Sequence, residues 1–237
     1  MGDECKRKRV IIHTIKIRND LKIIMKNVII FGDSYSTYEG YIPEGYHAYY
    51  SKNGREGEPA VTKMRVEETW WYQVISKTKD NLLLNNSWSG STIGYTGYNN
   101  SDCSKSSSFI YRFRKLKEEG FFEKNKVDTV FVFGGTNDSW AGAPLGEMKF
   151  SEWEEKNLYF VQPAICYLMN TLKTELPNAK IYFIVNTDLN PVIEDCLKKA
   201  GEYYNVPTIS LIEIEKECGH PNVKGMKLIA EQVLQRL

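Results

Sequence analysis

Residues 28–36 read Val-Ile-Ile-Phe-Gly-Asp-Ser-Tyr-Ser, and this stretch decides the fold. A short apolar run of β-branched and aromatic residues that stops at a glycine is typical of a strand buried on both faces, as in a parallel sheet. Sites in open parallel sheets form just beyond the carboxyl ends of the strands. Ser34 lies at such an end, where its hydroxyl would be exposed at the start of a helix. Taken alone, such a motif more often marks an ordinary turn in which Asp33 or Ser34 caps that helix.

Strand and helix patterns alternate along the rest of the chain. Further strands are predicted at residues 82–84, 127–133, 180–185 and 206–211, and helices at residues 68–79, 107–119, 153–176, 191–203 and 222–236. The longest helix is expected to break or bend near Pro163. The alternation predicts one three-layer α/β domain built around a parallel sheet of about five strands.

The length and charge of the chain limit the kind of protein it can be. Its 237 residues carry a formal net charge of +1, so a single domain of ordinary size is expected. A charge this close to zero gives no electrostatic reason to bind nucleic acid. No segment reaches the roughly 18 uninterrupted apolar residues of a membrane span, so no membrane association is predicted.

The N-terminal segment resembles a signal peptide only in part. A basic run at residues 6–9 precedes an apolar triplet at residues 10–12, but charged residues then interrupt any longer apolar segment. We interpret residues 1–24 as a tail or an extra edge strand outside the main domain, which spans residues 25–237. Met25 stands directly before the first strand and could be the natural start of the protein.

The cysteines and histidines do not suggest a metal site. Five cysteines are scattered with no pair at metal-ligand or redox spacing, which predicts reduced thiols and a cytoplasmic location. The three histidines, His13, His47 and His220, lie far apart in the sequence. No glycine-rich phosphate loop follows the first strand, which argues against a nucleotide-binding protein. No metal or other cofactor is therefore predicted.

Residues 38–68 show no sustained period and are dense in tyrosine, glycine and charged residues. A long segment of this kind inside a compact domain is in most cases functional or disordered. Its many aromatic side chains favour an ordered loop packed over a site. We therefore predict a lid or a substrate-binding loop, with a plain surface insertion as the alternative.

Small polar loops follow the first three predicted strands. They comprise residues 32–34, 86–90 and 135–138. Because right-handed crossovers bring the carboxyl ends of these strands to one edge of the sheet, the three loops are expected to meet there. Near the end of the chain, residues 217–222 read Glu-Cys-Gly-His-Pro-Asn, in which Pro221 and Asn222 are typical of a helix start. This pattern places His220 on a loop at a helix entrance.

In these four blocks the chain resembles the SGNH (GDSL-type) hydrolases. The matching residues occur in order: Gly-Asp-Ser at 32–34, Gly90 within Asn-Ser-Trp-Ser-Gly, Gly-Thr-Asn-Asp at 135–138 and His-Pro at 220–221. Each block alone is common, but four blocks in this order at the ends of the expected strands are specific. The resemblance extends over residues 28–237. It implies a flavodoxin-like α/β/α sandwich and ester hydrolysis by a serine nucleophile.

The resemblance also implies a role for each matching residue. Ser34 would attack an acyl carbon, and His220 would take the serine proton and return it to the leaving alcohol, because imidazole titrates near pH ~6.5. The backbone N–H groups of Ser34 and Gly90 and the side-chain amide of Asn137 match the positions that form the oxyanion hole of the family. Each residue alone also has an ordinary structural explanation, and only their joint occurrence favours catalysis.

One position departs from the family pattern. The family has an aspartate three residues before the catalytic histidine, and this chain has Glu217 there. A glutamate fills this role in other serine hydrolases, although its extra methylene requires the loop to lie further back. We predict Glu217 as the third catalytic residue, with a Ser-His dyad oriented by a backbone carbonyl as the alternative.

Aromatic residues flank the predicted site in the sequence. Trp88 precedes Gly90, and Trp140 follows the Asn-Asp pair by two residues. Together with Tyr38 and the neighbouring tyrosines they are candidate substrate-binding residues, which would suit a sugar face or a short acyl ester. Asp33 is a further candidate for substrate contact, although an aspartate at this position more often holds its own loop by hydrogen bonds.

The sequence thus predicts a metal-independent serine esterase that removes a short acyl group, acetyl in the first instance, from a carbohydrate or another small polar alcohol. Hydrolysis would pass through an acyl-enzyme on Ser34. The alternative within catalysis is a thioesterase, a lysophospholipase or an acyltransferase with the same residues. The alternative outside catalysis is a ligand-binding protein on the same fold, in which Glu217 marks a decayed triad.

Overall fold

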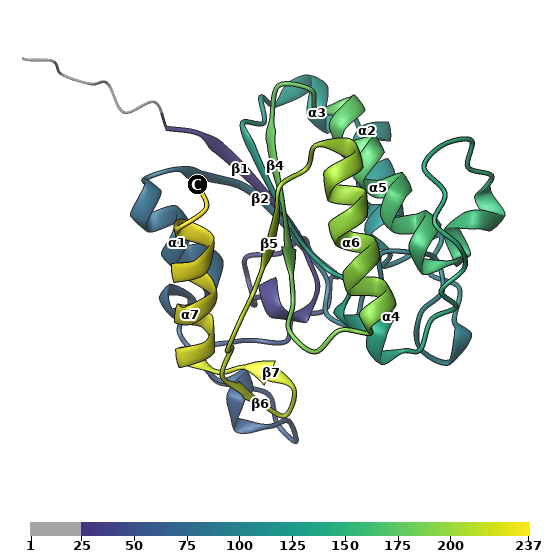
Figure 1. The fold of residues 1–237 in the computed structure, drawn as a ribbon. Helices are drawn as coiled ribbons and strands as arrows, with labels where there is room; N and C mark the ends of the chain where they lie inside the picture. Colours follow the sequence, from purple (N-terminus) through teal and green to yellow (C-terminus); the bar gives the residue numbers. More distant parts are fainter. Residues whose placement is uncertain (1–24) are drawn as a thin grey trace, which may run out of the picture.

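The structure, a computed structural model, describes residues 25–237 (Figure 1). The predicted tail or edge strand at residues 1–24 lies outside the described residues. A parallel sheet of five strands stands at the centre, in the order β2-β1-β3-β4-β5. These strands are β1 (Asn27–Gly32), β2 (Asn81–Ser87), β3 (Thr129–Phe133), β4 (Lys180–Val185) and β5 (Thr208–Ser210). The predicted parallel sheet is confirmed.

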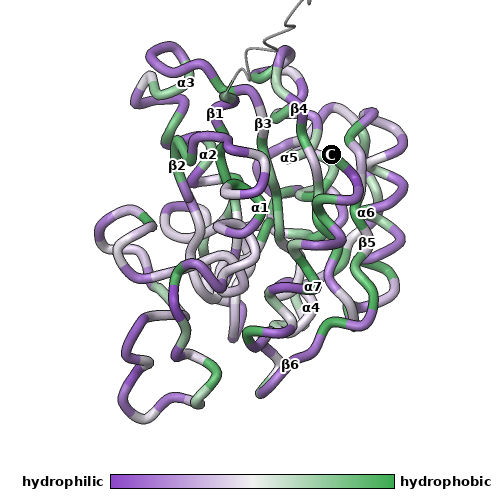
Figure 2. Tube along the Cα trace, turned by 90° about the vertical axis from the view of Figure 1, so that its left-hand side faces the viewer, coloured by the Kyte–Doolittle hydropathy of each residue, from purple (hydrophilic) through white to green (hydrophobic). Residues whose placement is uncertain are grey.

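Helices cover both faces of the sheet (Figure 1). One layer contains α1 (Trp70–Thr78) and α7 (Val223–Leu234), and the other contains α2 (Phe109–Glu118), α5 (Val161–Glu175) and α6 (Pro191–Tyr204). Neighbouring side chains of a strand point to opposite faces, so Val28 and Ile30 pack with the first layer while Ile29 packs with the second. Figure 2 shows the hydrophobic segments on the strands and hydrophilic ones in the outer loops. The α/β/α sandwich is confirmed, and burial on both faces explains the uninterrupted apolar run in β1.

The strand order is that of flavodoxin-like sheets, in which the winding of the chain reverses between β1 and β3. The loops that follow these two strands therefore diverge and leave the edge of the sheet open between them. Ser34 lies two residues after the end of β1, and Asn137 lies four residues after the end of β3. Both residues thus lie at the point where sheets of this topology bind their ligands.

Gly32 is required at the end of β1 by the close approach of its neighbours. A Cβ atom at this position would lie 2.4 Å from the Cβ of Ser36 and 2.6 Å from the Oγ of Ser87. Such distances are far below van der Waals contact, so a larger residue would push the turn after β1 away from the end of β2. The glycine of the Gly-Asp-Ser block therefore determines where Ser34 sits.

The helix predicted at residues 153–176 consists of two elements. A 3₁₀ turn at Glu155–Tyr159 precedes α5, and Phe160 between them has an extended backbone with φ of −110°. Pro163 lies in the first turn of α5, where its missing N–H breaks no helical hydrogen bond. The break therefore precedes the proline.

Several short elements have no periodic signal in the sequence and were not predicted. These elements are α3 (Phe121–Lys124), α4 (Thr136–Trp140), β6 (Lys216–Glu217) and β7 (His220–Pro221). The last two pair as a small antiparallel hairpin. Within the described residues, every helix is too short or too polar to span a membrane.

Residues 38–68 form an ordered loop, as predicted. Tyr50 is fully buried, and Ser51 pairs with Lys63 in an isolated bridge. The backbone N–H of Ser89 donates to the carbonyl of His47 at 2.8 Å. This contact places the loop directly beside the segment that follows β2, at the open edge of the sheet.

Candidate active site

A tight 3₁₀ turn at Ser34–Ser36 follows β1 and carries Ser34, which is buried and not exposed as the sequence predicted, because the turn packs against neighbouring loops. The Asp33 carboxylate caps this turn by accepting a hydrogen bond from the backbone N–H of Tyr35 at 3.0 Å. The Thr37 hydroxyl closes it by donating to the carbonyl of Ser34 at 3.0 Å. Asp33 is fully buried, and burial raises the pKa of its carboxyl to about 7. Asp33 therefore holds its own turn and does not face the solvent from which a substrate would enter.

His220 reaches Ser34 from the β6–β7 hairpin. Its Nε2 lies 3.0 Å from the Oγ of Ser34, although the two residues are 186 positions apart in the sequence. Its Nδ1 lies 3.2 Å from the carbonyl oxygen of Cys218. Since a carbonyl oxygen can only accept, Nδ1 carries the proton and Nε2 is free to accept the proton of the serine hydroxyl. Burial lowers the pKa of His220 from its ordinary value of 6.5, so the imidazole is neutral at neutral pH.

The turn of this hairpin consists of Cys218 and Gly219, which both have positive φ (49° and 78°), as a type I′ turn requires. Two tyrosines hold its carbonyl groups. Tyr35 donates its hydroxyl to the carbonyl of Gly219, and Tyr50 donates to that of Pro221 at 2.9 Å. The position of the imidazole is therefore determined by hydrogen bonds to the backbone on either side of His220.

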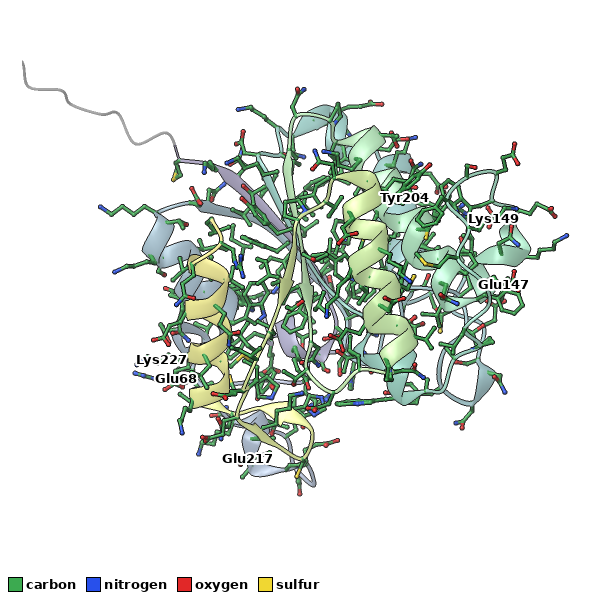
Figure 3. All side chains as sticks on the ribbon, viewed as in Figure 1. Glu68, Glu147, Lys149, Tyr204, Glu217 and Lys227 are labelled. Atoms are coloured by element: carbon green, nitrogen blue, oxygen red, sulfur yellow. The ribbon has the colours of Figure 1, made fainter. Side chains whose placement is uncertain are left out.

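Glu217 does not lie where a catalytic triad would require it. Its Oε1 accepts a hydrogen bond from the Nδ2 of Asn222 at 2.9 Å, and its side chain is exposed on β6 at the outer edge of the molecule (Figure 3). The physical reason is local: the tight turn brings the Cys218 carbonyl to Nδ1 of His220, and Asn222 at the start of α7 binds the carboxylate. The geometry matches the carbonyl-oriented dyad and not the predicted triad.

Tyr49 stacks on the imidazole, and its only signal in the sequence is the density of tyrosines in residues 38–68. The two ring centroids are 3.7 Å apart and the planes differ by 13°. The rings of Tyr35 and Trp140 each lie 5.4 Å from that of His220, at steeper angles. The imidazole is therefore enclosed by three aromatic side chains.

Gly90 and Asn137 converge on the same edge of the sheet. Gly90 has a φ of +80°, and its N–H donates to no acceptor within the described residues. The Asn137 side chain donates one hydrogen from Nδ2 to the carbonyl of Ser91 at 3.0 Å and accepts at Oδ1 from the Tyr98 hydroxyl at 2.8 Å. These two bonds fix the amide and leave its second Nδ2 hydrogen available for a ligand.

Asp138, next to Asn137, holds two loops together. Its carboxylate accepts hydrogen bonds from the backbone N–H groups of Ile93 at 3.0 Å and Gly94 at 3.4 Å. It is buried, and burial raises the pKa of the carboxyl to about 6. This aspartate therefore has a structural position.

Arg112 is a fully buried cation that the sequence analysis missed. Its guanidinium donates to the carbonyl of Gly32 at 3.2 Å, to the Oγ of Ser91 at 3.1 Å and to the Oδ1 of Asn86 at 3.0 Å. Further bonds reach the carbonyl groups of Asn86 and Ser107. A signal was present, since Arg112 stands three residues after Phe109 on the apolar face of the predicted helix.

The candidate substrate-binding aromatics occupy different environments. Tyr38 is buried and donates its hydroxyl to the carbonyl of Met64 at 3.0 Å, so it belongs to the core and not to the site wall. Trp88 is half-buried and packs on Tyr46 with ring centroids 4.3 Å apart. Trp140 is 43% exposed beside His220. Of the three predicted residues, only the two tryptophans are accessible near the site.

A cavity of about 460 Å³ lies within the loop of residues 38–68, and Tyr46 and His47 are among its lining residues. Tyr46 also contacts Trp88, and the His47 carbonyl binds Ser89, which immediately precedes Gly90. The cavity therefore adjoins the loop that follows β2 and could hold part of a polar ligand.

The fold and the four sequence blocks define a hydrolase of the SGNH type, and comparison with known proteins places the chain in a family. The chain matches the model of the GDSL-like Lipase/Acylhydrolase family over residues 26–237 and belongs to this family. None of the curated proteins compared with the chain matches it.

Solved structures share this fold. A protein of Bacteroides uniformis ATCC 8492 described as a GDSL-like lipase has 41% identity and a TM-score of 0.81, over 90% of this chain and 95% of that one. One from Bacteroides ovatus ATCC 8483 has 38% identity and a TM-score of 0.81, over 90% and 98%. An acetyl xylan esterase from Butyrivibrio proteoclasticus has 17% identity and a TM-score of 0.57, over 90% and 63%.

The network around Arg112 predicts a loss of stability when its donors are removed. Arg112→Met leaves the buried carbonyls of Gly32 and Asn86 with fewer donors, and we expect the free energy of unfolding to fall by about 3 kcal/mol. Urea denaturation followed by circular dichroism measures this. Lys115→Met, an exposed change on the same helix, is the control and should stay within about 0.5 kcal/mol of wild type. Equal effects of both substitutions would contradict the prediction.

Proposed function

We propose that this chain is a serine esterase in which Ser34 is the nucleophile and His220 is the general base. The observation that carries the proposal is the 3.0 Å contact between the Oγ of Ser34 and the Nε2 of His220. A serine hydroxyl needs such a base within hydrogen-bond reach to become nucleophilic. The convergence of Gly90 and Asn137 on the same edge of the sheet supports the same reading.

In the proposed reaction, Ser34 Oγ attacks the acyl carbon of the ester while its proton moves to Nε2 of His220. The negative charge on the former carbonyl oxygen is stabilised by the N–H groups of Ser34 and Gly90 and by the free Nδ2 hydrogen of Asn137. The intermediate then collapses: the bond to the alcohol breaks, and the proton on Nε2 passes to the leaving oxygen. Water, deprotonated by the same imidazole, releases the acid from the acyl-enzyme.

The dyad is the version of this mechanism that the contacts favour. The Cys218 carbonyl accepts from Nδ1 at 3.2 Å and selects the tautomer in which Nε2 is the base. Glu217 binds Asn222 instead and has no part in the proposed proton transfers.

The proposed substrate is a short acyl ester, with acetyl as the first choice, of a carbohydrate or another small polar alcohol. Support comes from the indole of Trp140, which is exposed beside His220, and from the Tyr46–Trp88 pair beside Gly90. Flat aromatic surfaces of this kind bind the apolar faces of sugar rings. Thioesters, lysophospholipids and acceptor alcohols would be attacked by the same residues, and a substrate panel separates these possibilities.

Substitution of the proposed dyad tests the mechanism. We expect Ser34→Ala and His220→Ala to reduce hydrolysis of p-nitrophenyl acetate by about 10³-fold or more, because nucleophile and base act as one unit. Glu217→Gln is the matched control and should retain activity close to wild type, since its carboxylate does not contact the imidazole. A large loss in Glu217→Gln would instead favour the triad.

The pH dependence tests the assignment of the base. A histidine base must be neutral, and burial lowers the pKa of His220 from 6.5. We therefore expect kcat/KM to be constant at neutral pH and to fall on the acid side with a midpoint below 6.5. Asp33→Asn should keep this midpoint. A midpoint near 7 that disappears in Asp33→Asn would contradict the prediction, because the pKa of the Asp33 carboxyl is raised to about 7.

Acyl and alcohol preference test the substrate class. We expect acetyl esters to be hydrolysed faster than octanoyl esters, and Trp140→Ala to raise KM for an acetylated oligosaccharide more than for p-nitrophenyl acetate, because only the sugar would stack on the indole. Initial rates over a chain-length series and both substrates measure this. Faster turnover of long-chain esters, or of thioesters, would overturn the proposed substrate.

A further inference from the structure

The imidazole of His220 is surrounded by aromatic rings and lacks the negative charge that a triad supplies. Within residues 25–237, no carboxylate forms a hydrogen bond to it, and the group on Nδ1 is the neutral carbonyl of Cys218. One face of the ring is covered by Tyr49, with centroids 3.7 Å apart and planes 13° from parallel. The proposed mechanism nevertheless places a full positive charge on this ring when Ser34 attacks.

Hydrogen bonds connect the backbone around Tyr49 to the segments that carry both residues of the proposed dyad. Its backbone N–H donates to the Oγ1 of Thr37 at 2.8 Å, and that hydroxyl donates to the carbonyl of Ser34 at 3.0 Å. The next residue, Tyr50, donates its hydroxyl to the carbonyl of Pro221 at 2.9 Å. The stacked ring is therefore held in register with the turn that presents the nucleophile and with the strand that carries the base.

An aromatic face is attractive to a cation. Its quadrupole is negative on the face, and a cation within about 6 Å of the centroid is stabilised, most strongly when both groups are removed from water. The stack of Tyr49 on His220 meets the distance condition, and both rings are half-buried and so partly removed from water. A parallel stack also fixes the plane of the imidazole and so the direction in which Nε2 points.

We infer that Tyr49 is a positioning residue that performs part of the role of the carboxylate of a triad; this inference rests on the proposed function. The Tyr49 ring stabilises the imidazolium of His220 in the transition state, and it orients the plane of the imidazole so that Nε2 points toward Ser34.

The face of the ring, and not the hydroxyl, performs this task. The Tyr49 hydroxyl makes no hydrogen bond within the part of the chain that the structure describes. Burial raises its pKa to about 12, so it also carries no charge at neutral pH. Phenylalanine should therefore replace Tyr49 with little loss, and an aliphatic residue should not.

Glu58 is the competing source of stabilisation. Burial lowers the pKa of the His220 imidazole and the Lys216 ammonium lowers it further, whereas the Glu58 carboxylate acts through space in the opposite direction. Glu58 is exposed, and solvent and salt weaken such interactions between separated charges. Glu58→Gln therefore belongs in the same experiment.

The test varies the electron density of the ring at nearly constant shape. Tyr49 is replaced by phenylalanine and then by 4-fluoro-, 3,5-difluoro- and 3,4,5-trifluorophenylalanine, each of which weakens the quadrupole further. We expect kcat for p-nitrophenyl acetate, and the rate at which a fluorophosphonate labels Ser34, to fall stepwise with fluorination while KM stays constant. The total decrease should be about 3- to 30-fold, the range that a cation–π contact supplies. Tyr49→Leu should lose at least as much as the trifluorinated variant.

Controls separate this inference from a packing effect. The same fluorinated residues at Tyr203, which is 63% exposed on α6, should leave kcat unchanged, and circular dichroism shows that each variant is folded. If kcat does not change across the fluorinated variants while the wild type is active, this inference is overturned and the proposed function is not. If kcat then falls as much in Glu58→Gln as in Tyr49→Leu, the stabilisation of the imidazolium belongs to the Glu58 carboxylate. A wild type that neither hydrolyses esters nor reacts with the fluorophosphonate overturns the proposed function, and this inference with it.

Discussion

The buried guanidinium of Arg112 is the interaction on which the geometry of the site depends. A cation removed from water is tolerated only when its donors are satisfied. All five N–H donors of Arg112 have acceptors, and these belong to Gly32, Asn86, Ser91 and Ser107. Burial lowers the pKa of this arginine to about 9, which still leaves it charged at neutral pH. The guanidinium therefore holds the end of β1, the end of β2 and the loop after β2 together through its hydrogen bonds.

The residues that Arg112 binds are connected in turn to the groups that would meet a substrate. Gly32 precedes the turn that presents Ser34, and its carbonyl also accepts from the N–H of Trp88 at 3.0 Å. Ser91 receives one hydrogen of the Asn137 amide. The proposed nucleophile and the proposed oxyanion donors thus lie on loops that are connected to a single buried group. This connection gives a set of loops the precision that catalysis requires.

The fold and the order of the site blocks could be predicted from the sequence because they depend on local patterns. The strand β1, the helices on both faces of the sheet and the positions of Ser34 and His220 follow from periodicity and short motifs. The partners of His220 could not be predicted in this way. Whether Glu217 or the Cys218 carbonyl meets Nδ1 depends on the turn geometry of a hairpin with two-residue strands. The stack of Tyr49 depends on the path of a loop that has no period, and such a path is set by tertiary contacts alone.

Residues 38–68 contribute to two sides of the site at once. Tyr46 builds the aromatic surface against Trp88, and three residues further along Tyr49 covers the imidazole. In most enzymes a recognition loop can diverge while the reacting groups on the scaffold stay constant. Under the proposed function, a change in residues 38–68 that alters substrate recognition would also shift the ring that packs on His220. Selectivity and chemical rate are therefore expected to evolve together in this chain, and a new specificity would require compensating substitutions around the histidine.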